Sequence, residues 1–219
     1  MNKKLLVTLI TLILIGMFST VAAENNHLFP WIRMGLGAKA MAMGGTGTAF
    51  MDNITATYWN PAALANVKRA EFATMYTDMG LDRMQNYAAL GTSFKYGYVA
   101  LSWINASVVD FEEYSGVDDY VGDFDYNAHN IGLSLALGPG KFKFGLTAKM
   151  YMDKMAEDTE NGFGSDLGIL WNINEYLSIA GMIRDIYSEM DKEEVPHQAV
   201  LGLAVYPIYG LTFATDLKT

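Results

Sequence analysis

The feature that most constrains this chain is a regular alternation of two kinds of residue after position 70. In residues 141–152 the even-numbered positions carry Phe, Phe, Leu, Ala, Met and Met, whereas the odd-numbered positions carry Lys, Lys, Gly, Thr, Lys and Tyr. A repeat of two places successive side chains on opposite faces of a β-strand, whereas a helix repeats every 3.6 residues. We therefore expect residues 71–219 to form an all-β structure.

Nine segments show this pattern and are separated by turn residues. They are Glu71–Met79, Met84–Lys95, Tyr98–Ser107, Ala128–Gly138, Lys141–Met152, Phe163–Ile173, Tyr176–Arg184, Gln198–Pro207 and Gly210–Lys218. Most have about the 9–11 residues that a tilted strand needs to cross a bilayer. Short links alternate with long connections at Val108–Asn127, Asp153–Gly162 and Asp185–His197, which predicts an antiparallel meander with its long loops at one end.

The two faces of these strands differ from those of a soluble sheet. In a soluble sandwich the face away from the core usually carries Lys, Glu, Arg and Thr, but here it is often Gly, Ala or Ser. The other face is nearly free of charge, as lipid requires, because a cation at mid-bilayer costs about 2–4 kcal/mol. Aromatic residues gather near strand ends, as in interfacial girdles: Tyr76, Tyr96, Trp103, Trp171, Tyr176, Tyr206 and Tyr209. The pattern favours a transmembrane β-barrel over a soluble sandwich.

The first 23 residues have the pattern of a secretory signal peptide. Lys3 and Lys4 are basic, Leu5–Phe18 is apolar, and Val21–Ala23 is a small-residue cleavage site. The apolar run is shorter than the about 20 residues of a spanning helix, so cleavage is favoured over an uncleaved anchor. The formal net charge of −9 argues against nucleic acid as a partner. The chain has no cysteine, which excludes disulfides and thiolate chemistry.

Residues 24–70 form a distinct stretch of the chain before the expected strands. Between Gly35 and Ala65 it is rich in Gly and Ala, so its backbone is able to approach another surface closely. The alternative for Gly44–Gly47 is a phosphate-binding loop, but the Gly-Lys-Ser/Thr ending is missing and no strand precedes it. We expect close backbone packing there instead.

The runs Ala38–Gly45, Ala49–Asp52 and Asn60–Ala62 resemble the N-terminal signature of FadL/PorV-type outer-membrane proteins, which include PorV/PorQ-like and UPF0164-like members. Gly162–Trp171 and Pro196–Asp216 resemble later strands of PorV-like members. The resemblance implies a bacterial outer-membrane location, with the N-terminal stretch as a hatch or plug inside the barrel. The residues that would form its plug motif are Gly44, Gly45, Asp52, Asn60, Pro61 and Ala62.

The strand count is unusual for such a protein. Nine is odd, whereas bacterial single-chain barrels have an even number of strands, and the final Lys218-Thr219 lacks the closing aromatic residue of this family. We expect a chain whose C-terminal strands are missing, and therefore an open, curved sheet with unpaired edges. The alternatives are an additional strand at Thr46–Met51 or closure by oligomerisation.

Two functions follow from the resemblance. The FadL branch implies passive uptake of hydrophobic small molecules such as long-chain fatty acids, and this is the first hypothesis. The PorV branch implies a component of protein secretion or surface attachment that docks exported proteins. A lumen lined by Met, Phe and Leu would favour uptake, whereas a polar, blocked lumen with an aromatic rim on Val108–Asn127 would favour docking. Membrane lipid is a partner in both cases.

The candidate site residues fall into two groups. Lys143, Lys149 and Asp166 are expected to face the lumen, since charges in spanning strands should point inward. Asp166 with Arg184 is expected as a lumen-facing pair or a rim contact. The candidate docking residues of the long external loop are Tyr114, Tyr120, Phe124 and Tyr126.

Cofactors, metals and catalysis are not expected. The acidic residues of 110–125 leave calcium as an alternative to a solvated loop, but their spacing fits no calcium loop. The three histidines are scattered without ligand spacing. Ser134 and His129 lie on opposite faces of one strand by parity, so they cannot act together as an esterase pair.

Overall fold

The computed structural model describes residues 30–219, apart from 115–119, 139, 157 and 191–192. The signal peptide expected at residues 1–23 therefore lies outside the described part of the chain.

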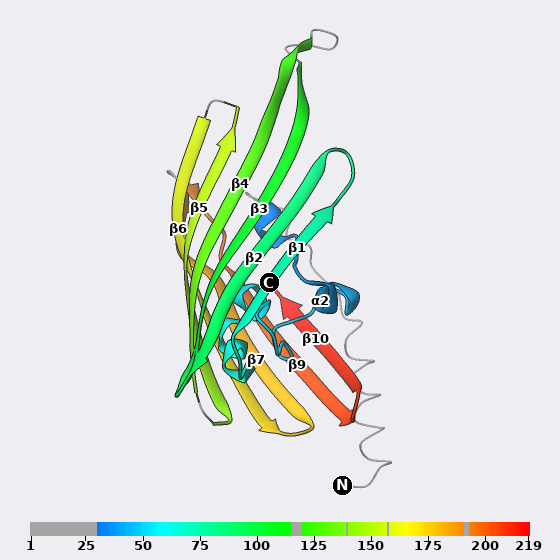
Figure 1. The fold of residues 1–219 in the computed structure, drawn as a ribbon, viewed down its shortest axis with the longest axis vertical. Coiled ribbons are helices and arrows are strands. Elements are labelled where there is room, and N and C mark those ends of the chain that lie inside the picture. Colours follow the sequence, from blue (N-terminus) through cyan, green and yellow to red (C-terminus); the bar gives the residue numbers. More distant parts are fainter. Residues whose placement is uncertain (1–29, 115–119, 139, 157, 191–192) are drawn as a thin grey trace.

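A single antiparallel sheet dominates the described residues (Figure 1). Nine strands follow one another in sequence order, and a short tenth strand, β8, pairs with β7. The strands are β1 (Glu71–Asp78), β2 (Arg83–Phe94), β3 (Gly97–Tyr114), β4 (Tyr120–Leu137), β5 (Phe142–Met155), β6 (Asp158–Asn174), β7 (Leu177–Met190), β8 (Glu193–Glu194), β9 (Gln198–Ile208) and β10 (Leu211–Lys218). The expectation of an all-β antiparallel meander is confirmed.

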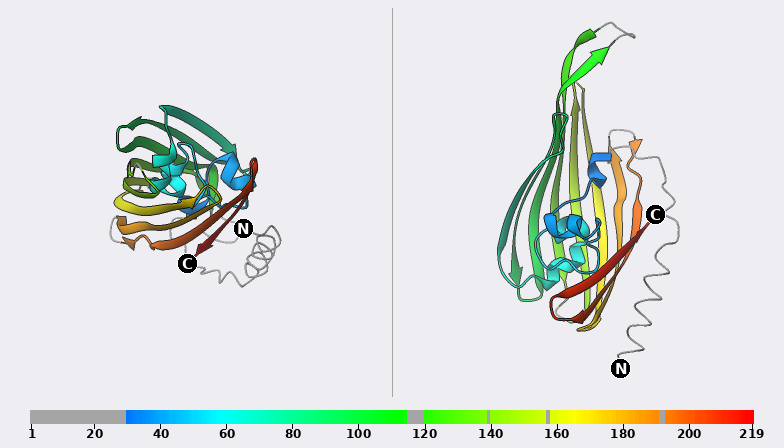
Figure 2. Two further views of the ribbon diagram at one scale, coloured as in Figure 1. Left: turned by 90° about the horizontal axis from the view of Figure 1, so that it is seen from below. Right: turned by 90° about the vertical axis from the view of Figure 1, so that its right-hand side faces the viewer.

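The sheet is curved but does not close on itself. Strands β1 and β10 form its two edges, and Figure 2 shows the sheet bending around the N-terminal residues. The expected open, curved sheet is therefore confirmed, and a closed barrel is not formed. The alternative of a further strand at Thr46–Met51 is wrong, because these residues are turn and irregular backbone.

The three connections expected to be long loops are mostly strand. Strand β3 continues to Tyr114 and β4 begins at Tyr120, and β5 and β6 are separated only by residues 156–157. Strand β7 likewise extends to Met190. The sequence interpretation limited each strand to the length of a bilayer crossing, but backbone pairing continues wherever two chains stay in register. The β3–β4 hairpin consequently rises above the neighbouring hairpins (Figure 1).

Burial alternates along the strands with the same period as the sequence. In β5 the small and polar odd-numbered residues, such as Gly145 and Thr147, are buried, and the apolar even-numbered residues, such as Phe144 and Leu146, are exposed. The small-residue face is the concave one, where the core lies. This distribution is the reverse of a soluble sandwich, in which the oily face would be buried.

The concave face is covered by residues 30–67, called here the N-terminal segment. It contains the short helices η1 (Pro30–Arg33), α2 (Ala38–Ala42), α3 (Ala56–Trp59) and η2 (Pro61–Asn66). Its apolar side chains form the main core together with inward residues of the sheet, among them Tyr87, Tyr98 and Leu170. Figure 2 shows these helices inside the curve of the sheet.

Candidate functional site

The Asn-Pro-Ala triplet of the N-terminal segment lies directly on two glycines of the sheet. A Cβ atom on Gly145 of β5 would be 2.1 Å from the backbone nitrogen of Ala62, and one on Gly168 of β6 would be 2.1 Å from Oδ1 of Asn60. Since real Cβ atoms do not approach other atoms so closely, any side chain at these positions would push η2 away from the sheet. The small residues of the concave face thus match the shape of this motif.

Asn60 joins three parts of the chain by hydrogen bonds. Its side-chain nitrogen donates to the carbonyls of Thr48 at 2.9 Å and of Ile169 at 3.2 Å. Its side-chain oxygen accepts from the backbone N–H of Ala62 at 3.0 Å, which caps η2, and Pro61 occupies the first position of that helix. Asn60 is fully buried, so each of these bonds replaces one to water.

Carboxylates at both edges of the sheet hold the backbone of the N-terminal segment. Oδ2 of Asp216 on β10 accepts from the N–H groups of Gly47 and Thr48 at 2.9 and 3.1 Å, and from the Thr48 hydroxyl at 2.8 Å. At the opposite edge, Oε2 of Glu71 on β1 accepts from the N–H of Ile54 at 2.8 Å. The segment therefore connects the two edge strands that do not pair with each other.

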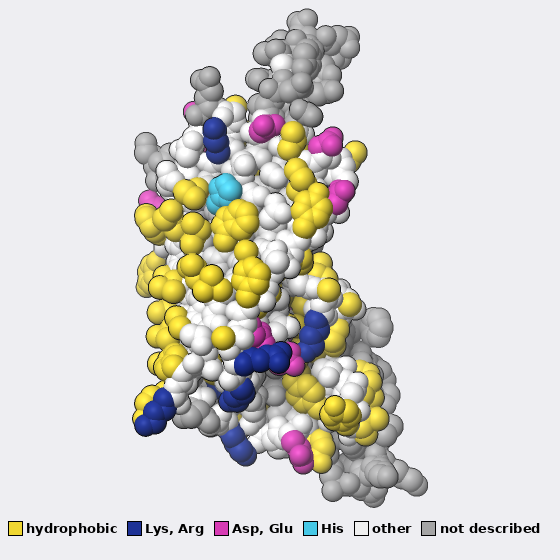
Figure 3. Space-filling model, in the orientation of Figure 1, with side chains coloured by type: hydrophobic (Ala, Val, Ile, Leu, Met, Phe, Trp, Pro, Cys, Tyr) yellow, Lys and Arg dark blue, Asp and Glu magenta, His cyan; other side chains and the backbone are white. Residues whose placement is uncertain are grey.

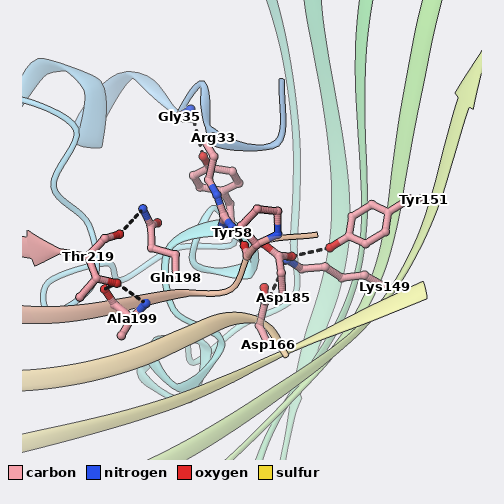
Figure 4. Close-up of polar contacts among 11 residues, drawn as sticks. Arg33, Gly35, Tyr58, Lys149, Tyr151, Asp166, Asp185, Gln198, Ala199 and Thr219 are labelled. Atoms are coloured by element: carbon pink, nitrogen blue, oxygen red, sulfur yellow. Dashed lines mark hydrogen bonds and ion pairs between the residues drawn. The ribbon is translucent and has the colours of Figure 1, made fainter. Parts of the chain in front are cut away.

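A buried group of charges lies between the sheet and η1 (Figure 4). Nζ of Lys149 lies 2.6 Å from Asp166 and 2.8 Å from Asp185, while Nη1 of Arg33 lies 2.7 Å from Asp185. The Tyr151 hydroxyl also donates to Asp185, and Asp166 accepts from the backbone N–H of Asp185 at 2.9 Å. Buried ions are tolerated only with such partners.

An irregularity in β7 makes this charge group possible. Asp185 has a φ of 57°, a left-handed conformation that Asp tolerates better than most residues, and the pairing of β6 with β7 shifts on both sides of Ser165. Arg184 and Asp185 are consecutive, yet both are buried on the concave side. A regular strand would have placed one of them on the outer face.

The interior next to these charges is small and polar. A cavity of about 20 Å³ is lined by polar residues that include Arg33, Thr57, Lys149, Asp166 and Arg184. That volume holds about one water molecule. The space beside the buried charges is thus filled. At the end of the sheet with the short turns, a wider hollow of about 680 Å³ remains between the N-terminal segment and the strands, and residues that include Lys39, Phe50, Asp52, Lys141 and Tyr206 line it.

The convex face carries large apolar side chains from nearly every strand. Phe72, Leu90, Leu101, Leu133, Phe144, Ile169, Ile179 and Leu201 are each 41–71% exposed. Figure 3 shows such side chains grouped over the strands. An apolar groove of about 520 Å³ near the β1 edge is lined by residues that include Phe72, Leu90, Val99, Leu101 and Leu133.

The residues of the expected plug motif differ in burial and packing. Asn60, Pro61 and Ala62 are buried against the sheet. Gly44 and Gly45 have φ of 75° and 72°, and no atom lies within 4 Å of a Cβ built on either, so they serve a left-handed turn. The close packing expected for Gly44–Gly47 is found at Gly47, where a Cβ would overlap the Trp59 ring. Asp52 is exposed and pairs with Lys39 at 2.7 Å.

The three residues expected to face a lumen all lie on the concave side. Lys143 and Lys149 are on β5, and Asp166 is on β6. The sequence left the meeting of Asp166 with Arg184 as a hypothesis. Both residues line the same small cavity, but the cation that pairs with Asp166 is Lys149. Arg184 instead stacks over aromatic rings, with its Cζ 4.9 Å from the ring centre of Tyr58.

The candidate docking residues belong to the β3–β4 hairpin. Tyr114 and Tyr120 are backbone partners, and Phe124 pairs with Phe111. The side chains of Tyr114, Tyr120 and Phe124, and most acidic side chains of 110–125, lie outside the described residues.

The sequence interpretation expected Tyr126 on an exposed rim, but the structure places it elsewhere. Its hydroxyl donates to Oδ2 of Asp153 at 2.7 Å, and the same oxygen accepts from the indole of Trp31 at 3.1 Å. Tyr126 is therefore an interior contact between β4, β5 and the N-terminal segment.

Several residues of this interior were missed by the sequence interpretation. Tyr151 was placed on the odd-numbered face with Lys149, but no contact was predicted for it. Asp153 continues the same face, so parity would have placed it inside had it not been assigned to a loop. Asp185 was assigned to a loop, and no local pattern reveals the shift that brings it inward. Arg33 belongs to the N-terminal segment, and nothing in the sequence indicates its partner on β7.

No family model, curated protein or solved structure matches this chain. The resemblance to FadL/PorV-type proteins therefore depends on the motif residues themselves. Within the described residues, no helix is both long and apolar enough to cross a membrane. In the same part of the chain, no three His, Asp or Glu residues are grouped so that they would hold a metal ion.

Proposed function

We propose that this chain is an integral outer-membrane protein whose sheet forms a wall in the bilayer, with the N-terminal segment as its luminal plug. The observation that carries the proposal is the apolar convex face, since soluble monomers rarely expose a contiguous apolar patch beyond a few hundred Å². The leader expected at residues 1–23 is consistent with export.

Within that class, the interior supports docking of exported proteins over uptake through a lumen. Pockets for small molecules usually measure roughly 300–1,000 Å³ and are mostly apolar. The cavity beside the buried charges is about 20 Å³ and is lined by charged and hydroxyl-bearing residues, so the interior is blocked at that level. The wider hollow of about 680 Å³ at the end with the short turns has a mixed lining, in which Lys39, Asp52 and Lys141 lie beside Phe50 and Tyr206. The β3–β4 hairpin, which extends beyond its neighbours, would then be the docking element (Figure 1).

Uptake of a hydrophobic small molecule such as a long-chain fatty acid is the second candidate. The groove of about 520 Å³ on the convex face favours it, because its volume and apolar lining suit an acyl chain. A molecule bound there would have to displace part of the N-terminal segment to pass inward, since Asn60 and Asp216 hold that segment on the sheet.

Shortening the β3–β4 hairpin separates the two functions. Val108 and Tyr126 are partners in the register, so residues 109–125 are replaced by an Asn-Gly turn that closes the hairpin at that level. Docking predicts that exported proteins are lost from the cell surface while uptake of labelled oleate is unchanged. The control alters the turn residues Gly80–Asp82 between β1 and β2 and leaves the β3–β4 hairpin intact, so both surface display and oleate uptake should be unchanged. Loss of oleate uptake with normal surface proteins would reverse the ranking.

A further inference from the structure

Arg184 is a buried cation with two unpaired nitrogens. The residue is 4% exposed, and its Nε and Nη2 atoms are buried without a hydrogen-bond partner. A guanidinium stays charged at any physiological pH. Because an unpaired ion is costly to remove from water, a group that supplies negative charge is expected beside it.

The two carboxylates of the buried charge group, Asp166 and Asp185, already have partners. Asp166 lies 2.6 Å from Lys149, and Asp185 lies 2.8 Å from Lys149 and 2.7 Å from Arg33. Three cations, Arg33, Lys149 and Arg184, thus line one cavity, and the two carboxylates are used by the first two. The balance around the cavity is one positive charge in excess.

Aromatic rings only partly offset this excess. The guanidinium carbon of Arg184 lies 4.9 Å from the ring centre of Tyr58 and 5.7 Å from that of Trp59. Such cation–π contacts are favourable, but they are weaker than the cost of burying an ion without a counter-charge. Lys218 also lies over the Trp59 ring, at 5.5 Å, but the carboxylate of Asp216 acts on Lys218 as well. These two charges offset each other, and the excess of one positive charge remains.

The cavity beside Arg184 offers a place for the missing charge. It measures about 20 Å³, and the hydroxyl-bearing residues Thr57 and Ser102 and the amide-bearing Asn130 also line it. The volume suits a particle the size of a water molecule or a single-atom ion, and it excludes an acid with an alkyl chain. The charge of Asp166 in the cavity wall is matched by Lys149.

We propose that this cavity binds a small inorganic monovalent anion, of the size of chloride, as the counter-ion of Arg184. The anion would tie β7 to the N-terminal segment, because Arg184 comes from β7 whereas Arg33 and Thr57 come from that segment. The inference does not depend on the docking function proposed above.

Thermal unfolding of the full chain in detergent tests the proposal. Sodium chloride, sodium butyrate and sodium gluconate are compared at equal ionic strength. Chloride should raise Tm above gluconate and saturate as a single site, since a ligand of the native state stabilises it by mass action. Butyrate should behave like gluconate. Equal Tm in chloride and gluconate would overturn the proposal. A rise in Tm with butyrate as large as that with chloride would also overturn it, because the site would then bind carboxylates.

Variants assign the effect to Arg184. Arg184→Met should abolish the difference between chloride and gluconate, whereas Arg83→Met, which removes an exposed arginine at the β1–β2 turn, should keep it. If Arg184→Met does not fold, Arg184→Lys keeps the charge and should retain a chloride dependence with weaker apparent affinity. A full chloride effect in Arg184→Met, or none in Arg184→Lys when wild type shows one, would contradict the assignment.

Discussion

At the scale of single residues, Lys149 is a buried charge that partners surround. Lys149 on β5 contacts two carboxylates, and its side chain is only 9% exposed. A buried ion pair does not have to stabilise a fold relative to apolar residues, but removing one member leaves the others uncompensated. The cost of such a change therefore measures the environment of the remaining charges.

Lys149→Met should destabilise the protein by about 3–5 kcal/mol, because Asp166 and part of Asp185 lose their counter-charge in a buried site. Urea unfolding in detergent micelles measures this change. Lys154→Met, an exposed lysine on the same strand, is the control and should stay within about 0.5 kcal/mol of wild type. Equal effects of the two variants would mean that the buried charge group contributes nothing specific.

At the scale of elements, the inner surface of the sheet is shaped by absent side chains. Gly145 and Gly168 lie under η2, so the helix and strands β5 and β6 approach to backbone contact. Other glycines have no such role: a Cβ on Gly181, which faces outward, would find its first neighbour at an ordinary 3.4 Å from Ile169. The position of a glycine on the sheet, rather than its presence, thus decides its importance.

Gly168→Val should loosen the N-terminal segment, because the new side chain would occupy the position of the Asn60 amide. Overpacking of this kind costs typically about 1–3 kcal/mol, to which the lost Asn60 hydrogen bonds add. Limited proteolysis of residues 30–67 should become faster, as should urea unfolding. Gly181→Val on β7 is the matched control, and an equally fast cleavage in that variant would rule out the contact with η2 as the cause.

At the scale of the whole molecule, the sheet has an apolar convex face and a concave face that the N-terminal segment covers, with charged groups buried between them. Trp103 and Trp171 face outward at 37% and 41% exposure, whereas Trp31 and Trp59 are buried by the N-terminal segment and the sheet. This asymmetry allows the proposed membrane location to be tested without altering the core.

Lipids brominated on their acyl chains should quench about half of the tryptophan emission of the reconstituted protein, because two of the four tryptophans face outward. The double variant Trp103→Phe with Trp171→Phe should lose the quenched component and keep the emission of the buried pair. If wild type is not quenched, or if the double variant is quenched as strongly as wild type, the convex face does not contact acyl chains.

The alternation of residues was enough to predict most of the strands and the two faces of each. In a β-strand every second side chain lies on the same face. Phe144 and Leu146 were therefore placed together, opposite Gly145 and Thr147. The inward position of Lys149 and Asp166 followed from a second rule, that charges in spanning strands point inward. Strand ends were set too short, because polarity at a hairpin tip does not stop backbone pairing.

Which residues contact one another, by contrast, became visible only in the folded chain. Asp185 reaches Arg33 because a register shift in β7 breaks the alternation, and Asp216 reaches Thr48 across 168 positions of the chain. Contacts of this kind depend on how the sheet curves around the N-terminal segment. This curvature is the sum of small twists between many neighbouring strands. The alternation along a strand sets the face on which each side chain lies. The curvature of the sheet and the register shift in β7 set which residue it contacts.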